Sequence, residues 1–277
     1  MKRLLEIEFI KLWNNKISRV IIYAYFTLIC SLALIAAIKF DIGPIKFHLA
    51  EQGIFNFPYI WHLNTFFGAL FKVFLAIIIV SMTANEYSYK TIKQNLIDGL
   101  SKKEFILSKV YMSGLFALIS TIFIFTISLI LGLVYSDYNE LGIIFSDLSF
   151  ILAYFVKLFT FFSFCLFAGV LVKKSAYALG FIVIWQMFEG FVRGMIQWKL
   201  FDGETTDTIM GFFPLNSMWN LLKEPFSRFE AVQTVAQQIG EELKLDYYTS
   251  IGDFSIAIFW AIAFIYLSYF ILKKRDL

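Results

Sequence analysis

The chain has 277 residues, of which 59% are hydrophobic and 16% are charged. A soluble globular domain carries about 25% charged residues, so this composition excludes an ordinary soluble protein and predicts an integral membrane protein. The formal net charge of +3 is small, and a charge of this size gives no support to a nucleic-acid partner.

Long apolar runs predict an all-α membrane domain that occupies the whole chain, residues 1–277, as one unit. Each run has about the 20 residues that a helix needs to cross a bilayer. The six predicted spans are Val20–Ile38, Ile60–Met82, Val110–Val134, Phe150–Val172, Ser175–Ile196 and Phe254–Leu272.

The distribution of basic residues predicts the side that each loop faces. With the N-terminus placed inside, fifteen of the 24 Lys and Arg residues fall in inner segments, six in outer segments and three within spans. Lys and Arg are enriched in cytoplasmic loops. Both termini are therefore expected in the cytoplasm.

The segment that precedes the first span, residues 1–16, predicts a short helix in the cytoplasmic interface. Leu5, Phe9, Leu12 and Trp13 fall on one helical face, with charged residues around it. This amphipathic pattern is typical of helices that lie on a membrane surface. A simple charged leader to the first span is the alternative.

The loop between the second and third spans, residues 85–104, contains a helical stripe. Tyr89, Ile92, Leu96 and Leu100 recur at helical spacing, which predicts a short amphipathic helix. Two interpretations stay open. The helix rests on lipid head groups with its lysines drawn to anionic lipid, or its stripe docks into a groove of a soluble partner.

The same loop carries signals for a helix end and a new helix start. Gly99 is suited to end a helix. Ser101 and Glu104 then have capping-box spacing before an apolar run, which predicts a helix that continues into the third span.

Four ionisable residues fall within or beside the predicted spans. A charge at the bilayer centre costs about 2.5–3.5 kcal/mol, so each is expected to have a partner or a function. Lys157 and Glu189 lie at similar depth on a helical hairpin and are predicted to pair, directly or through water, as a packing salt bridge or as a cargo contact. Arg193 lies one turn beyond and could share Glu189. Lys72 faces a polar cavity between protomers or reaches toward the interface.

The outer loop, residues 197–253, is acidic and is expected to hold interfacial helices. Trp198–Asp253 contains nine Asp and Glu residues against four Lys and Arg residues. Ala231–Leu245 has helical apolar spacing. An acidic solvated cap is the alternative. Within the fifth span, Gly190 and Gly194 form a G-x-x-x-G pattern that permits close helix approach.

The loop between the second and third spans resembles a known family. The residues that match the E…GT…L…P-x-[ST]-R…K pattern of ABC-2 type permeases are Glu86, Thr91, Leu96, Ser101, Lys102 and Lys109. The chain departs from this pattern at three positions. Gly99 stands near the position where the family has proline, Lys102 replaces Arg, and Lys90 in place of Gly precedes Thr91. It is most similar to permeases of lantibiotic-immunity, bacteriocin or multidrug export.

The resemblance implies a permease subunit of an ATP-driven exporter in a bacterial cytoplasmic membrane, crossing it several times. It implies that residues around Glu86, Tyr89, Thr91, Ile92, Leu96 and Leu100 form a coupling helix that contacts a separate ATP-binding subunit. It also implies a second permease copy or a paralogue.

No chemistry of its own is expected from the chain. The sequence contains no G-x-x-x-x-G-K-[ST] motif, so ATP and Mg²⁺ would be bound by the partner ATPase. No cofactor or metal site is expected. The alternative function is a non-transporting membrane anchor or scaffold that recruits a cytoplasmic protein through the same loop.

Overall fold

The computed structural model describes residues 2–37, 39–42, 45–48, 54–199, 203–228 and 247–275. The first half contains α1 (Lys2–Asn14), α2 (Lys16–Ala37), β1 (Lys39–Ile42), β2 (Ile45–His48), α3 (Tyr59–Leu70), α4 (Lys72–Ser88), α5 (Thr91–Ile97) and α6 (Lys102–Tyr135). The second half contains α7 (Leu141–Ile144), α8 (Ser149–Val172), α9 (Ser175–Lys199), α10 (Gly203–Met210), α11 (Pro214–Asn220), the 3₁₀ turn η2 (Phe226–Arg228) and α13 (Ile251–Lys274).

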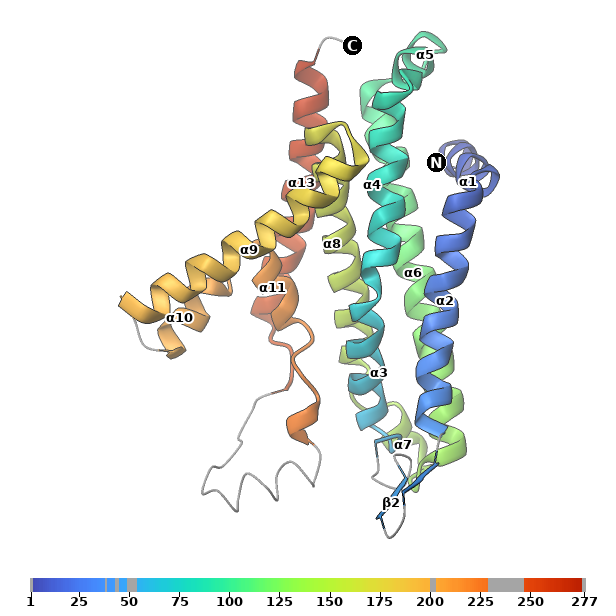
Figure 1. The fold of residues 1–277 in the computed structure, drawn as a ribbon, viewed down its shortest axis with the longest axis vertical. Helices are drawn as coiled ribbons and strands as arrows, with labels where there is room; N and C mark the ends of the chain where they lie inside the picture. The colour runs from blue at the N-terminus through green and yellow to red at the C-terminus, as the bar shows by residue number, and fades with distance from the viewer. Residues whose placement is uncertain are drawn as a thin grey trace.

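The long helices run side by side and place three chain segments at one end. In Figure 1 this end carries α1, α5 and the C-terminus, whereas α7 and β2 lie at the opposite end. Helix α8 lies at the centre and contacts α3, α4, α6, α9 and α13. A hydrogen bond of 2.9 Å between the Tyr25 and Tyr154 hydroxyls joins α2 to α8 within the core.

The described residues contain four helices that are long and apolar enough to cross a membrane. These are α6, α7–α8 taken together, α9 and α13, and the bent pair α3–α4 makes a fifth if it is counted as one span. The first predicted span corresponds to α2, a helix of 22 residues. The count of six spans therefore remains a prediction.

The predicted second span, Ile60–Met82, is not one straight helix. It is divided between α3 and α4, which meet at an angle of 43°. At the break the amide of Phe71 donates to the Gly68 carbonyl at 3.2 Å. This bond spans three residues, as in a 3₁₀ turn, where an α-helical bond spans four. The bend places Lys72 at the first position of α4.

A two-stranded hairpin also departs from the all-helical prediction. β1 and β2 pair antiparallel, with Lys39 opposite His48 and Ile42 opposite Ile45. The strands follow α2 directly, at the end of the molecule away from α5 (Figure 1).

The N-terminal helix forms as predicted over Lys2–Asn14. Figure 1 shows α1 almost end-on beside the lengthwise α2, so the two helices cross. The predicted apolar face is divided: Leu12 is buried, whereas Phe9 and Trp13 are exposed and stack at 5.7 Å between ring centroids. The Asn15 side chain accepts from the Ile17 amide at 3.0 Å and helps to begin α2.

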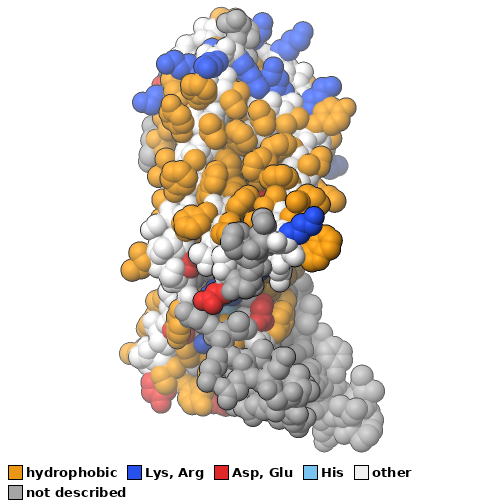
Figure 2. All heavy atoms as spheres, turned by 90° about the vertical axis from the view of Figure 1, so that its left-hand side faces the viewer, with side chains coloured by type: hydrophobic (Ala, Val, Ile, Leu, Met, Phe, Trp, Pro, Cys, Tyr) orange, Lys and Arg blue, Asp and Glu red, His pale blue; other side chains and the backbone are white. Residues whose placement is uncertain are grey.

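Charge and apolar surface are separated along the long axis. Figure 2 shows Lys and Arg side chains gathered at the end that carries α5 and a broad hydrophobic region below them. Helix α9 leans away from the other helices in Figure 1 and continues toward α10. Most of its apolar side chains are exposed, including Ile184, Met187 and Phe191. The predicted helix Ala231–Leu245 lies outside the described residues.

Candidate functional site

Helix α5 has sharp boundaries that its sequence explains. It begins after Lys90, which adopts a left-handed conformation with φ of 59°. It ends at Ile97, and Gly99 follows with φ of +95°. A Cβ at Gly99 would meet nothing within 4 Å, so glycine is suited to this position by its backbone and not by close packing. The predicted helix end is confirmed.

The capping box at the start of α6 is also confirmed. The Glu104 amide donates to the Ser101 hydroxyl at 3.1 Å, and the Ser101 amide donates to the Glu104 carboxylate at 2.9 Å. These two bonds satisfy amides that have no partner within the helix. Helix α6 then continues for 34 residues, so α5 is joined to a span by one short turn.

A cluster of four charges lies beneath α5, and three of them are buried. Lys109 of α6 contacts two carboxylates: its ammonium donates to Glu8 of α1 at 2.5 Å and also to Glu86 of α4. Lys11 of α1 donates to Glu86 at 3.1 Å. Lys109 is 0% exposed, Glu8 3% and Glu86 6%. The cluster balances two carboxylates with two ammonium groups.

Glu86 connects this cluster to α5. Its second carboxylate oxygen accepts from the Asn95 amide group at 2.8 Å, and its backbone carbonyl accepts from the Thr91 hydroxyl at 3.4 Å. Both donors lie on α5. Glu86 therefore touches α1, α5 and α6 as well as its own helix.

Electrostatics keep the cluster charged. Burial alone would lower the pKa of Lys11, but the carboxylates of Glu8 and Glu86 outweigh burial and raise the pKa above its ordinary value. A buried ion pair is stable only when each charge keeps a partner, because an isolated buried charge has lost its hydration.

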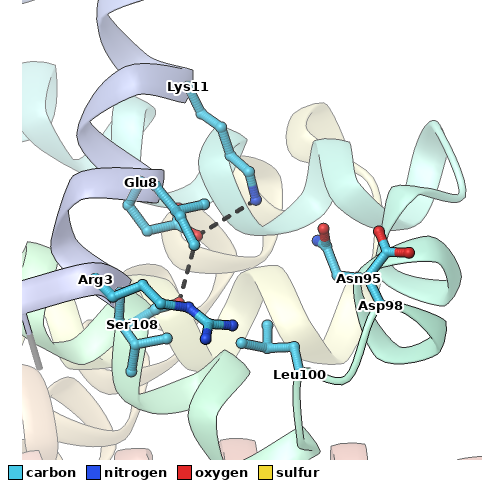
Figure 3. Close-up of a pocket in the computed structure, with 9 residues that line it drawn as sticks. Arg3, Glu8, Lys11, Asn95, Asp98, Leu100 and Ser108 are labelled. Carbon is cyan, nitrogen blue, oxygen red and sulfur yellow. Dashed lines mark hydrogen bonds and ion pairs between the residues drawn. The ribbon is translucent and has the colours of Figure 1, made fainter.

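A small cavity separates α1 from the end of α5. Its volume is about 160 Å³. Figure 3 shows Arg3, Glu8 and Lys11 of α1 on one side and Asn95 and Asp98 on the other. A molecule that contacts the tip of α5 thus also lies near the polar side of α1.

The predicted apolar stripe faces the chain itself. Ile92 is 2% exposed, and Leu96 and Leu100 pack partly buried against the core. Tyr89 is 75% exposed and lies before α5, at the end of α4. The role of these residues in coupling remains a prediction, but Ile92 does not offer its side chain to a partner. The outward face of α5 carries Lys93, Gln94 and Ile97.

Glu8 was not among the predicted site residues. It occupies the same helical side as Leu5 and Leu12, three residues after the first and four before the second. A carboxylate on the apolar side of an amphipathic helix was the available signal, because such a residue needs a cation when the helix packs.

The predicted direct pair between Lys157 and Glu189 does not form. The Lys157 ammonium donates to the Leu222 carbonyl at 3.4 Å. Glu189 accepts from the amides of Leu215 and Asn216 at 3.1 and 3.0 Å. Both side chains are buried, but the carboxylate is occupied by the first turn of α11.

Arg193 has a different partner from the one predicted, and Lys72, for which no partner was predicted, lies against an aromatic ring. Arg193 pairs with Asp207 of α10 and donates to Asn216 at 3.2 Å, so it does not share Glu189. Lys72 lies over the Phe161 ring with its ammonium 4.4 Å from the centroid. Among the described residues, no group of three or more His, Cys, Asp or Glu side chains is placed to hold a metal ion.

Comparison with known protein families identifies the architecture. The model of the ABC-2 family transporter protein matches residues 10–277. The chain belongs to the ABC-2 transporter family. The match begins within α1 after Glu8 and includes the other three charges of the cluster, α5 and all candidate spans. No curated protein matches the chain.

Membership gives the coarse function of this ABC-2 protein. It is a multi-pass transporter membrane component. ABC-2 membrane proteins typically lack an ATPase domain and act with an ATPase partner. The charged end with α1 and α5 is the candidate place for that contact.

Proposed function

We propose that this ABC-2 protein is the permease subunit of an ATP-driven exporter that works by alternating access. A separate ATPase would bind ATP and Mg²⁺ and hydrolyse the nucleotide, and the permease would perform no covalent chemistry. The family match over residues 10–277 supports the transporter role. The similarity to lantibiotic-immunity, bacteriocin and multidrug permeases rests on the loop motif.

The proposed topology has six spans with both termini in the cytoplasm of a bacterial cell. The gathering of Lys and Arg at the end with α1, α5 and the C-terminus supports this orientation (Figure 2). Basic residues are retained on the cytoplasmic side during insertion. The exposed Phe9 and Trp13 rings of α1 would then lie in lipid at the interface.

The observation that carries the coupling proposal is the buried position of Glu86. Through Asn95 it is hydrogen-bonded to α5, and through Lys109 it is paired with α6. Breaking these buried contacts is costly, so displacement of α5 is expected to move α4 and α6 with it. A helix that is fixed in this way can transmit motion of an ATPase to two spans.

The exposed face of this end is the proposed ATPase contact. Tyr89 is 75% exposed and Ile97 is 83% exposed. Beside them, Lys90 and Lys93 line a hollow of about 310 Å³ with Lys173 and Lys174 at the α8–α9 turn. This surface combines apolar anchors with positive charge and fits an acidic groove on the ATPase.

A second copy or a paralogue would complete the transport path. Helix α9 is proposed as the contact between the two permeases. A Cβ at Gly190 or Gly194 would meet nothing within 4 Å in this chain, so both glycines are open to another helix. Met187 and Phe191 are exposed next to them.

Co-purification with ATPase activity tests the proposal. The permease is isolated from native membranes in mild detergent, and ATP hydrolysis by the product is measured. Wild type and a Lys103→Glu control are expected to retain the activity, whereas Lys93→Glu/Ile97→Asp is expected to lose it. The three substituted residues, Lys93, Ile97 and Lys103, have exposed side chains, so the fold is expected to be preserved.

Two outcomes would contradict the proposal. Hydrolysis retained by Lys93→Glu/Ile97→Asp would exclude the outward face of α5 as the contact. An intact wild-type permease with no ATPase activity in any preparation would remove the energy source and favour the anchor or scaffold function.

A further inference from the structure

A second cavity lies among the spans, far from the charged cluster. It is lined by the α3–α4 bend together with α8, α9 and α11, and its volume is about 390 Å³. This volume falls in the range of about 300–1,000 Å³ that is typical of small-molecule sites. Its walls are mainly apolar and aromatic, with Phe66, Ile77, Phe161, Ile182, Val183 and Trp219 among them.

Two lysines are the charged side chains in this wall. Lys72 enters from the start of α4 and Lys157 enters from α8. Each ammonium lies over an aromatic ring: that of Lys72 is 4.4 Å from the Phe161 centroid, and that of Lys157 is 5.3 Å from the Trp219 centroid. An aromatic face compensates only part of the hydration that a buried cation loses.

No carboxylate among the described lining residues balances these two charges. Lys157 donates a hydrogen bond to the Leu222 carbonyl at 3.4 Å. The carboxylate that the sequence predicted as a partner, Glu189, accepts from the α11 amides and from the Trp185 indole, which donates at 2.7 Å. The buried cluster of α1, α4 and α6 shows that this chain does pair its buried lysines elsewhere.

Both lysines lie far from the helix ends that face the charged end of the molecule. Lys72 is sixteen residues from the end of α4 at Ser88, and Lys157 is fifteen residues from the end of α8 at Val172. At 1.5 Å per residue these separations are about 24 and 22 Å. A charge at this depth in a bilayer is costly, and it usually marks a pathway or a ligand counter-ion.

We propose that this cavity binds an anionic amphiphile, with the acidic head between Lys72 and Lys157 and an apolar chain along the aromatic wall. The head supplies the negative charge that the described lining residues do not provide, and the chain occupies the apolar volume. The site goes beyond the proposed transport role, because it binds its ligand whether or not an ATPase is attached.

The same chemistry can come from two sources. A phospholipid with a net negative head group would enter from the bilayer, whereas a single-chain carboxylate would enter as a free amphiphile. Both present an anionic oxygen group on an apolar chain. Phosphatidylglycerol and dodecanoate represent the two sources, and phosphatidylcholine with the same acyl chains represents a lipid without net charge.

Native mass spectrometry of the purified permease in neutral detergent tests the proposal without an ATPase. The protein is incubated with equal amounts of phosphatidylglycerol and phosphatidylcholine, and the ratio of the two bound forms is measured. Wild type is expected to favour phosphatidylglycerol by about tenfold or more, because the quaternary ammonium of phosphatidylcholine offsets its phosphate and is repelled by the two lysines. Lys72→Gln/Lys157→Gln is expected to bring this ratio close to one.

Matched variants separate the cavity from general attraction to basic surface. Lys173→Gln/Lys174→Gln removes the same charge from the exposed α8–α9 turn and is expected to keep the preference. Lys72→Arg/Lys157→Arg retains both positive charges and is also expected to retain the preference for phosphatidylglycerol. A single elution peak and an unchanged thermal transition establish that each variant is folded.

Dodecanoate distinguishes the sources. If it displaces phosphatidylglycerol from wild type, the site accepts single-chain acids; if phosphatidylglycerol is retained, the ligand is a membrane phospholipid. The proposal is overturned if wild type shows no preference for the acidic lipid, or if the folded Lys72→Gln/Lys157→Gln protein keeps the wild-type preference.

Discussion

Glu86 at the end of α4 and Lys109 near the start of α6 form a buried ion pair. The pair joins the two helices that flank α5, and Lys109 also binds Glu8 of the crossing helix α1. Three segments that meet at the charged end are thus held by one ammonium group. Loss of that group leaves two buried carboxylates whose remaining ion-pair partner among the described residues is the exposed Lys11.

Lys109→Met is therefore expected to lower the free energy of unfolding by about 3–5 kcal/mol, which is the usual effect of removing one partner of a buried pair. Chemical unfolding in mixed micelles measures the change. Lys103→Met is the matched control, because Lys103 lies on the same helix and is exposed. Equal effects of the two variants would mean that the cluster contributes nothing specific.

The two isoleucines of α5 differ sharply in their burial. Ile92 is 2% exposed, whereas Ile97 is 83% exposed. Ile92→Ala is expected to lower the free energy of unfolding by about 2–5 kcal/mol, and Ile97→Ala is expected to change it by less than about 0.5 kcal/mol. The same unfolding assay compares them.

Binding of the ATPase is expected to depend more on Ile97 than on Ile92, the reverse of their effects on stability. Ile97→Ala should weaken co-purification of ATPase activity although the permease itself is unaffected. A stable Ile97→Ala permease that retains all of the activity would place the partner contact elsewhere.

The ends of α5 and the start of α6 could be predicted because their signals are local. Gly99 provides a left-handed position, and Ser101 with Glu104 forms the capping box in one turn of chain. Neither feature depends on distant residues. The direction of the stripe on α5 does depend on them, since a short amphipathic helix can turn its apolar face to its own core or to a partner.

The predicted pairing of Lys157 with Glu189 shows a second limit of prediction from sequence. Equal depth on a hairpin follows from counting residues, but rotation about each helix axis does not. Glu189 faces α11, a segment that comes 25 residues later in the chain and supplies two amides. The α3–α4 bend was also hidden, because the run around Phe71 has no proline, and the single charged residue Lys72 does not by itself predict a bend.

Gly132 marks a close approach between α6 and the segment before α3. A Cβ at this position would overlap the Phe57 ring. Gly132→Ala is therefore expected to lower the free energy of unfolding by about 1–3 kcal/mol through overpacking. Gly142→Ala is the control, since a Cβ there meets nothing within 4 Å. Thermal unfolding of the two purified variants should separate them, and an undiminished Gly132→Ala protein would contradict this packing.

Glu189 fixes α11 against α9 by accepting two backbone amides. Glu189→Ala leaves both amides without this acceptor and is expected to destabilise the protein by about 2–4 kcal/mol in total. Gln197→Ala, at an exposed position of the same helix, should have little effect. Hydrogen exchange is the more specific measurement: amides of α11 should lose protection in Glu189→Ala, and retained protection would show that other contacts hold α11.

The exposed side of α9 gives a test of the second permease copy. Met187 and Phe191 are exposed beside the open Gly190. With the exposed Cys30 replaced by serine, Met187→Cys is expected to form disulfide-linked dimers in native membranes. Ile122→Cys, on the exposed side of α6, serves as the control for random collision. Dimers from Ile122→Cys alone, or equal yields from both positions, would exclude α9 as the contact, whereas selective crosslinking at Met187→Cys would place the G-x-x-x-G segment at the centre of the permease pair.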